Sequence, residues 1–563
     1  MLLRSRAVIA LLSTTLCLTV FFWARSLHGV TGGFVALMLC AFSPMVIAHG
    51  QLATSDMCAA LFFMLGTWTF WICLHRLTGL RLAACAASLA ALTLSKTSVV
   101  LFAPVAALMM LLALWRQGEL RVSFGGWTTT LHTRSERLTA AFGVLVLCVA
   151  VSWAALWLAF GCRFEPYPPG ERASFQQYLF PGVPASTLEA VAAYLDTTGK
   201  VLLFCDQTRL FPDAFINGTA YVLAALHRYA FLNGSYSPMG WWYFFPYAFL
   251  VKTTLPMVLL LAVAGVVAVR AAMAHPAEAS RQRLLDRIHA ASPLLVLLVV
   301  YWTTLLFSTI NIGARHMLPV YPAVCVLAGF LGSRPARGWL RYGVVLLLAW
   351  HVGEGIRAYP HYLAYFNQFV GRTNAYRHMV DSNLDWGQDL PGLKAWLDRR
   401  LAAGPPTRAF IAYFGSGSPE YYRVPAEPLD LELRAQKGLP PVGGAGVYCV
   451  SATELQSVYP PVAGRWNSAR EGEYQDLIRR IQAINSLAQP KPESWTQAHE
   501  KEFAEIERRF RILASARFLA FLRQRVPDDN IGFSILIFEL TQDDVRRAFD
   551  GPPPELGDAA EAS

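Results

Sequence analysis

The chain has 563 residues, of which 55% are hydrophobic and only 15% are charged, whereas an average soluble domain has roughly 25% charged residues. This composition predicts a protein that uses lipid as its solvent. The formal net charge is +10, but the Arg residues are dispersed in short loops between apolar runs rather than gathered on one face. The basic balance therefore does not indicate nucleic-acid binding.

The fold class follows from apolar segments of spanning length. A membrane-spanning helix needs about 20 mostly apolar residues. Ten segments reach or approach this length, at 7–24, 30–48, 56–74, 82–95, 97–115, 139–160, 247–270, 292–309, 317–333 and 339–356. We expect a polytopic α-helical membrane protein, with about six spans in residues 1–160 and about four in residues 247–356.

Two stretches lie outside these segments. Residues 161–246 form a polar, aromatic-rich loop, and residues 357–550 show a helical pattern at 390–403, a strand at 408–415, a strand followed by a helix at 444–455, a helix at 497–525 and a strand at 532–540. The second stretch predicts a small α/β domain, followed by a disordered tail at 551–563. It contains no phosphate loop or nucleophile elbow, so soluble-enzyme chemistry is not indicated.

The orientation follows from Arg residues in the short connections. They occupy every second connection, from Arg25 to Arg341, and such loops favour the cytoplasm. The loop at 161–246 and the α/β domain are therefore expected to be extracytoplasmic. The same rule places Met1 outside, beside Arg4 and Arg6. Either a span upstream of this Met1 or reversed insertion of the first two segments would resolve that conflict.

Charged residues at the outer ends of the predicted spans are the candidate site. Asp56, Lys96, Lys252 and Arg315 all fall on that side, and His316 follows Arg315. A charge at membrane depth costs roughly 2.5–3.5 kcal/mol on insertion scales and is normally paired or functional. One carboxylate and three cations predict a phosphate-binding site with a base nearby.

Simpler roles are open for each of these residues. The cations could be snorkelling anchors with their heads among lipid phosphates, and Asp56 could only cap its helix. His316 and His49 have no second ligand residue at metal-binding spacing, so both are expected to be packing or hydrogen-bonding residues and no metal site is predicted.

Two further stretches carry candidate residues. Trp241, Trp242 and Tyr243 end the 161–246 loop, as an aromatic belt at the headgroup level or as part of a substrate groove. The second stretch, DSNLDWGQDL at 381–390, contains Asp381, Asp385 and Asp389 with Trp386 and Gln388. Its carboxylates could act as a base or position an acceptor. Alternatively, Asp381 and Asp385 cap or brace the helix that starts at 390, with Trp386 packing beneath them.

Several motifs together resemble a known family. They are AHGQLATSD, LTLSKTS, GWWYFFPYAFLVKTTLP, NIGARHMLPVYP, YLAYFNQFVG and DSNLDWGQDLPGLKAWL, and in this order they resemble the bacterial, phospholipid-carrier-dependent branch of glycosyltransferase family 39, relatives of protein O-mannosyltransferases and of the aminoarabinose transferase of lipid A. The resemblance implies a C-type glycosyltransferase bundle in the bacterial inner membrane. It also implies transfer of a sugar from a polyprenyl phosphate to a glycan, lipid or protein acceptor of the cell envelope, without a metal or other cofactor.

The resemblance also implies roles for the candidate residues. Asp56 matches the family's acidic position, Lys96 and Lys252 match its lysines, and Arg315 matches the arginine of its G-x-R-x-x-L-P signature. The carboxylate would orient or deprotonate the acceptor, while the three cations bind the donor phosphate. The expected substrate groove contains Trp241, Trp242, Tyr243, His316, Trp386 and Gln388.

One departure from the family affects the choice of catalytic base. Family members place a first span, and then an outer loop with an acidic pair, before the segment that here begins at Met1. We expect either that the chain is an N-terminally truncated version or that it works with another carboxylate, for which Asp385 and Asp381 are candidates beside Asp56. Two other functions are open: a transporter or flippase of a lipid-linked sugar, against which the sequence shows no internal repeat, and an inactive family member that acts as a binding partner.

Overall fold

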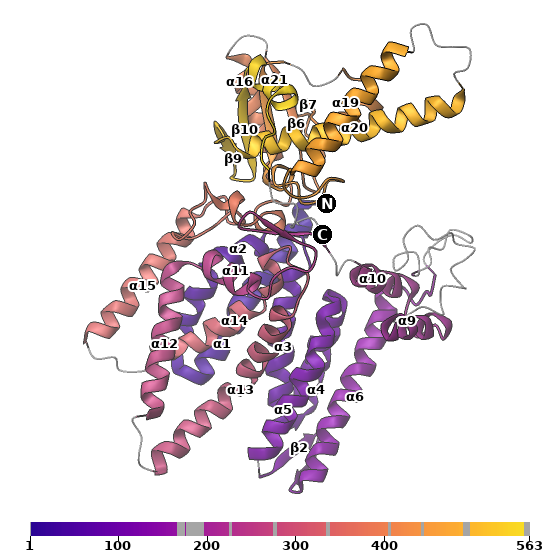
Figure 1. Ribbon diagram of the computed structural model, residues 1–563. Helices are drawn as coiled ribbons and strands as arrows, with labels where there is room; N and C mark the ends of the chain where they lie inside the picture. The colour runs from indigo at the N-terminus through magenta and orange to yellow at the C-terminus, as the bar shows by residue number, and fades with distance from the viewer. Residues whose placement is uncertain are drawn as a thin grey trace. The chain divides into compact units, whose positions relative to one another are not determined.

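The computed structural model describes residues 2–116, 118–165, 175, 196–224, 228–273, 278–333, 338–403, 407–440, 444–487 and 496–556. The chain divides into two compact units, which are described separately (Figure 1). The helical unit comprises Met1–His227, Trp242–Ile310 and Ala314–Tyr362, and the sheet unit comprises Arg228–Trp241, Asn311–Gly313 and Leu363–Ser563.

All ten predicted apolar segments are helical. The helical unit contains α1 (Leu2–Ala41), α2 (Pro44–Gly50), α3 (Asp56–His75), α4 (Gly79–Ser95), α5 (Phe102–Arg116), α6 (Arg134–Ala159), α9 (Thr197–Gln207), α10 (Asp213–Ala224), α11 (Phe244–Lys252), α12 (Leu255–Met273), α13 (Glu278–Leu306), α14 (Val320–Ala328) and α15 (Gly338–Arg357). Among the described residues, five helices are long and apolar enough to cross a membrane, or six if the bent pair α11–α12 is one span. The prediction of a helical membrane protein with a C-terminal α/β region is confirmed.

The predicted span at 247–270 is broken rather than straight. Helices α11 and α12 meet at an angle of 110°, because Thr253 takes an extended conformation with φ −91° and ψ 141°. Buried hydrogen bonds hold this bend: the Thr253 and Tyr321 hydroxyls lie 2.9 Å apart, and Thr254 Oγ1 lies 2.7 Å from His351 Nδ1. Non-helical backbone at membrane depth is tolerated where such contacts satisfy it.

The tautomer of His351 follows from its partners. Its Nε2 lies 3.1 Å from the Leu39 carbonyl oxygen, which can only accept, so Nε2 carries the hydrogen and Nδ1 accepts from the Thr254 hydroxyl. One imidazole therefore connects α1, the α11–α12 bend and α15.

A small sheet in the helical unit was missing from the sequence prediction. Strands β2 (Leu120–Phe124) and β3 (Trp127–Leu131) form an antiparallel hairpin around Gly125 and Gly126, and β1 (Arg76–Thr78) pairs parallel with β2. The sequence signal was present, because a Gly-Gly pair between two strand-like runs is typical of a two-residue hairpin.

The predicted loop at 161–246 contains more regular structure than expected. Helices α9 and α10 belong to the helical unit, and the Leu210 carbonyl after α9 accepts hydrogen bonds from the indoles of Trp153 and Trp157 on α6. Strands β4 (Ala230–Leu232) and β5 (Ser235–Ser237) form a hairpin in the sheet unit. Most of the remaining loop, at 166–174 and 176–195, lies outside the described residues, as does the predicted tail from 557 onwards.

The sheet unit is a five-stranded mixed sheet with the order β7-β6-β8-β10-β9. The strands are β6 (Arg408–Ala412), β7 (Glu427–Pro428), β8 (Gly446–Ser451), β9 (Asp529–Ile531) and β10 (Ile535–Leu540), and the helices are α16 (Leu390–Ala402), α17 (Leu431–Gln436), α18 (Ala452–Leu455), α19 (Ser468–Leu487), α20 (Gln497–Arg523) and α21 (Gln542–Asp550). Strand β8 runs parallel to β6, with Ala409 opposite Val447, and antiparallel to β10. Strands β6, β8 and β10 and helices α16, α18 and α20 lie where the sequence predicts them, whereas β7, β9, α17, α19 and α21 were missed.

Both faces of this sheet are covered. Alternate strand residues, such as Ile411, Cys449 and Ile537, pack in one core with leucines of α16. The residues between them point the other way, so that Tyr448 stacks on Phe410 at 4.8 Å and contacts Phe518 of α20 at 5.3 Å between ring centroids. The two-residue period of a strand produces this division, and burial on both faces explains why β8 is entirely apolar or small.

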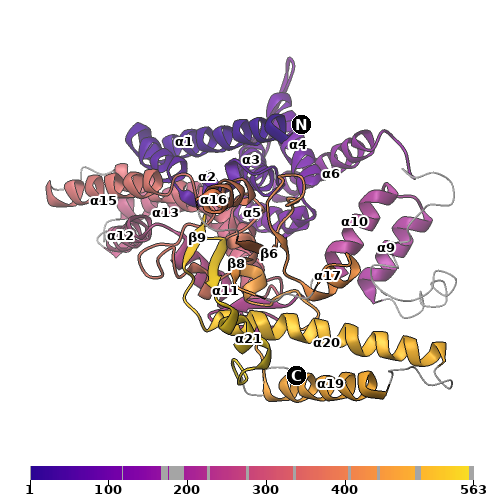
Figure 2. The same cartoon turned by 90° about the horizontal axis from the view of Figure 1, so that it is seen from above.

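A buried ion pair connects α19 to α20, which run side by side (Figures 1 and 2). The Arg517 side chain is fully buried, and its Nε donates to Glu471 Oε2 at 2.9 Å. The indole of Trp466 donates to the same oxygen at 2.7 Å. Loss of one partner from such a network leaves an uncompensated buried charge.

We predict that Arg517→Met lowers the thermal unfolding midpoint of the sheet unit by about 10 °C, because breaking a buried pair costs about 3–5 kcal/mol. The midpoint is measured by calorimetry on the purified full chain in detergent. Arg546→Met is the matched control, since Arg546 and its partner Asp543 are both exposed and such pairs contribute little. Equal midpoints for the two variants would contradict the prediction.

Candidate functional site

Breaks between helices place the charged residues of the helical unit. Asp56 is the first residue of α3, and Lys96 is the extended residue between α4 and the 3₁₀ turn η1 (Thr97–Leu101). Lys252 ends α11 at the bend, and Arg315 lies in the 3₁₀ turn η4 (Ala314–Met317) before α14. We call these four residues the charge cluster.

Asp56 is at the centre of the charge cluster. It is 3% exposed, its Oδ1 accepts a hydrogen bond from Lys96 Nζ at 2.5 Å, and its Oδ2 lies 3.9 Å from Arg315 Nη1. The Asp56 side chain does not cap α3. Ser55 occupies the N-cap position of this helix, and its side chain makes no capping hydrogen bond either. The position at the N-terminus of α3 also favours a carboxylate through the helix dipole.

Two histidines lie among the same charges. His49 interacts electrostatically with Asp56, Lys96, Lys252 and Arg315. His316 interacts with Asp56, Lys96, Arg315 and His49, and its ring packs edge-on against Phe245 at 6.4 Å. Both were expected to be packing or hydrogen-bonding residues rather than metal ligands, and both lie within electrostatic reach of the charge cluster.

The charges of the cluster do not balance. Lys252 is 3% exposed and, through its electrostatic interaction with His49, adds a third basic side chain to surroundings that hold the one carboxylate of Asp56. An excess of positive charge in a place poor in water favours an anion with several oxygens, such as a phosphate. In the described part of the chain, no three His, Cys, Asp or Glu side chains are arranged to hold a metal ion.

The aromatic run at 241–245 has two kinds of environment. In the helical unit, Trp242 and Tyr243 are exposed and touch edge-on at 5.7 Å, whereas Phe244 and Phe245 are fully buried. Trp241 belongs to the sheet unit, where its N–H donates to Asn311 Oδ1 at 2.7 Å. Exposed aromatic faces at this place suit a lipid headgroup region.

Residues 381–390 form a loop of the sheet unit, and several hydrogen bonds join residues within this loop. Asp381 takes a left-handed conformation with φ 57° and accepts hydrogen bonds from Ser382 N–H and the Tyr459 hydroxyl. The Gln388 amide accepts from Trp386 N–H at 2.7 Å and donates to the Leu384 carbonyl at 2.8 Å. The N-cap of α16 is Asp389, which makes no side-chain capping bond, and Asp381 and Asp385 lie before that position.

Asp385 is the loop carboxylate with the unusual environment. It is 2% exposed; its Oδ1 accepts from Gly387 N–H at 2.7 Å, and its Oδ2 accepts no well-aligned hydrogen bond from the described residues. Burial raises the pKa of Asp385 to about 7, against the effect of the Gly387 hydrogen bond and with a contribution from the negative charges of Asp389 and Asp381. A carboxyl with such a pKa can take and give a proton near neutral pH.

Tyr413 closes the loop beside Asp385 and was not singled out in the sequence. Gly387 has φ +82°, and a Cβ there would lie 2.5 Å from the Tyr413 hydroxyl oxygen. The backbone conformation and the tyrosine therefore both require glycine. The sequence feature that could have indicated this close contact was Gly387, between Trp386 and Gln388.

Comparisons with known proteins give distant structural similarities. No family model and no curated protein matches the sequence. The archaeal oligosaccharyltransferase AglB from Archaeoglobus fulgidus, in complex with an inhibitory peptide and a dolichol-phosphate, is 14% identical with a TM-score of 0.37, over 80% of this chain and 58% of that chain. ArnT from Cupriavidus metallidurans, bound to undecaprenyl phosphate, is 13% identical with a TM-score of 0.37, over 82% of this chain and 81% of that chain.

The chain thus spans less than two thirds of the oligosaccharyltransferase. Because both TM-scores lie below 0.5, the function proposed for this chain rests on its own residues.

We predict that Asp385 makes the sheet unit less stable as the pH rises from about 5 to 8. The pKa is about 7 in the folded state and about 3.9 in an unfolded chain, so between these values the folded state holds the proton more tightly and stability falls as the pH rises. Asp385→Asn should remove this contribution, so that the amount by which its thermal midpoint exceeds that of the unmodified protein is several degrees larger at pH 8 than at pH 5.

The matched control is Asp398→Asn, because Asp398 is half exposed on α16. Its midpoint difference from the unmodified protein should not change across the same pH range. A difference for Asp385→Asn that is constant with pH would show that Asp385 is ionised throughout.

Proposed function

We propose that the chain is a membrane glycosyltransferase that moves a sugar from a polyprenyl-phosphate donor to an acceptor on the extracytoplasmic face of a bacterial inner membrane. The observation that carries the proposal is the charge cluster, in which a buried carboxylate is paired with Lys96 and Arg315 and a third basic side chain, Lys252, is buried and interacts with the same His49 as the other three. The family 39 motifs in the sequence agree with this proposal and suggest a polyprenyl phosphate as the carrier.

The cations have a defined task in this reaction. A hydroxyl oxygen of the acceptor attacks the anomeric carbon of the sugar, the bond from that carbon to the phosphate oxygen breaks, and the electron pair leaves with the polyprenyl phosphate. The phosphate thereby gains one negative charge. Lys96, Lys252 and Arg315 would stabilise that charge as it develops, and preorganised charges in a site with little water are effective in this task.

Asp56 is better suited to orient cations than to remove a proton. Its two oxygens face Lys96 and Arg315, and a carboxylate engaged by two cations has little affinity for a proton. We propose that Asp56 holds these two side chains in place for the donor phosphate, so that they do not need to be ordered when the substrate arrives.

Asp385 is the better candidate for the base. Its buried oxygen without a well-aligned hydrogen bond and its pKa near 7 suit the transfer of a proton from the acceptor hydroxyl. Asp381 is less suited, because the Tyr459 hydroxyl and the Ser382 N–H bond its two oxygens. Trp242, Tyr243 and His316 are proposed to contact the donor, and Trp386 and Gln388 the acceptor.

We predict that Lys96→Met and Arg315→Gln each lower transfer by about 10² to 10³-fold, the usual loss when one group that stabilises transition-state charge is removed. The assay uses the purified full chain in liposomes with synthetic polyprenyl-phosphate hexoses and pentoses, and measures the polyprenyl phosphate released. Arg270→Gln, an exposed cation in the last turn of α12, should keep full activity. Full activity in both cluster variants would refute the proposed function.

We predict that transfer rises with pH up to about 7 and then levels off, because the base must lose its proton. Asp385→Asn should abolish this rise and lower the rate by about 10² to 10⁴-fold, while Asp381→Asn should keep the pH profile. An unchanged profile in Asp385→Asn, together with a loss in Asp56→Asn, would assign the base to Asp56 instead.

A further inference from the structure

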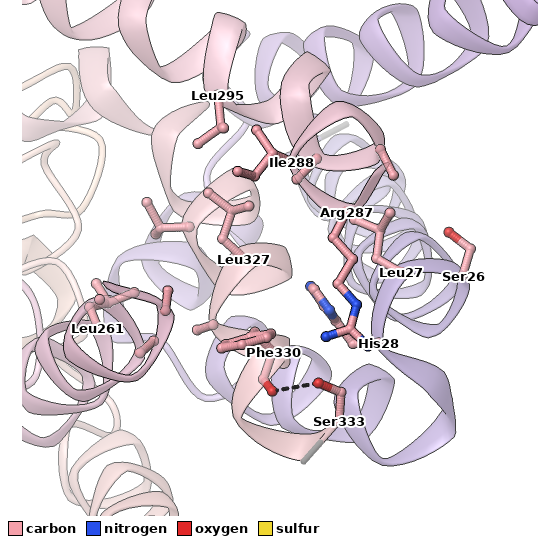
Figure 3. A pocket seen from close by; sticks show the side chains of 17 residues that line it. Ser26, Leu27, His28, Leu261, Arg287, Ile288, Leu295, Leu327, Phe330 and Ser333 are labelled. Carbon is pink, nitrogen blue, oxygen red and sulfur yellow. Dashed lines mark hydrogen bonds between the residues drawn. The ribbon is translucent and has the colours of Figure 1, made fainter. Parts of the chain in front are cut away.

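A second polar group of residues lies in the helical unit away from the charge cluster. It lines a cavity of about 560 Å³ between α1, α12, α13, α14 and the 3₁₀ turn η5 (Gly329–Gly332) (Figure 3). Helix α12 begins three residues after Lys252 but lines the cavity from Leu261 to Ala268, roughly 9 to 20 Å further along the helix at 1.5 Å per residue. The cavity is therefore a separate site.

The walls of the cavity are apolar. Figure 3 shows Leu261, Leu295 and Leu327 around it, from three different helices. The same helices expose large aliphatic side chains beside the cavity, including Val266 and Val269 on α12. In a bilayer these surfaces contact acyl chains, so a lipid chain can enter the cavity without crossing water.

Two basic side chains form the polar end of the cavity. The Arg287 guanidinium lies beside the His28 ring (Figure 3), and the two groups interact electrostatically. Arg287 forms no ion pair with a carboxylate of the described residues. His28 Nε2 is buried without a hydrogen-bond partner in that same part of the chain, although the ring also bonds the Val326 backbone.

The kink of α1 produces this arrangement. Gly29 has φ 76° and an extended ψ of −179°, which interrupts the helix directly after His28. The ring then packs edge-on against Phe330 at 6.0 Å between centroids. A residue with a Cβ would be strained at this φ, so the glycine fixes the position of His28 at the cavity.

From these observations we propose that the cavity binds an anionic glycerophospholipid with a hydroxyl-bearing headgroup. Its phosphate would bind Arg287, a headgroup hydroxyl would bond His28 Nε2, and one acyl chain would fill the apolar part. A guanidinium and a phosphate are complementary in charge and geometry. The volume is in the range of about 300 to 1,000 Å³ that holds a drug-sized molecule, which suits a single acyl chain better than a long polyprenyl chain.

The test is native mass spectrometry of the purified full chain, with phosphatidylglycerol as the probe and phosphatidylcholine as the comparison lipid. We expect one tightly retained phosphatidylglycerol and no retained phosphatidylcholine. Arg287→Gln should weaken retention by about tenfold or more, through loss of a charge-assisted hydrogen bond. Ala264→Trp should do the same by filling the cavity. The matched control is Arg341→Gln, an exposed cation of α15 outside the cavity, which should retain the lipid as before.

Three results would overturn the proposal: equal retention in all variants, equal retention of both lipids, or displacement of phosphatidylglycerol by an equimolar polyprenyl phosphate. The last would make the cavity a site for the donor carrier. Arg287→Lys keeps a charge and should retain part of the binding, which separates loss of the site from misfolding. Because the readout is lipid retention, the result does not depend on the proposed transferase activity.

Discussion

Charge buried at membrane depth must be compensated, and this constraint organises the helical unit. Asp56, Lys96 and Arg315 come from three separate parts of the chain and satisfy one another at the ends of broken helices. A continuous helix would have kept its backbone bonds but could not have turned these side chains toward a common point. The breaks interrupt the regular helical hydrogen bonds and bring the polar side chains together. Polar contacts such as that between Thr254 and His351 hold the backbone where it departs from the helix.

The two units place their charged side chains in different environments. The helical unit concentrates cations where an anion can bind, and the sheet unit buries a carboxyl without a cation beside it. Asp385 is held by one backbone N–H in a loop closed by Tyr413, so burial rather than a charge partner decides its affinity for a proton. In the proposed reaction the leaving group gains negative charge and the acceptor loses a proton, and the two environments suit these opposite demands.

Hydropathy was sufficient for the apolar helices, whereas the polar helices α9, α10, α19 and α21 were missed. Hydropathy located all ten helical segments, and the distribution of Arg residues placed Asp56, Lys96, Lys252 and Arg315 at the same end of the spans. The pairing itself was not predictable, because it depends on the extended conformation of Lys96 and on the bend at Thr253. The burial of Asp385 was equally hidden, since residues far along the chain, such as Tyr413 directly after β6, lie beside it. The hairpin at 120–131 had a Gly-Gly signal that its position between two apolar helices obscured.

The imidazole of His351 has a consequence for biosynthesis. It joins Leu39 near the start of the chain to Thr254 in the middle, and it lies on α15, which follows all the other helices of the unit. The bend that positions Lys252 thus reaches its final hydrogen bonding only when α15 has been synthesised and inserted. Until then, the ribosome-bound chain lacks the hydrogen bond between Thr254 and His351 at this bend. The geometry of the bend beside Lys252 is in this way tied to completion of the membrane bundle.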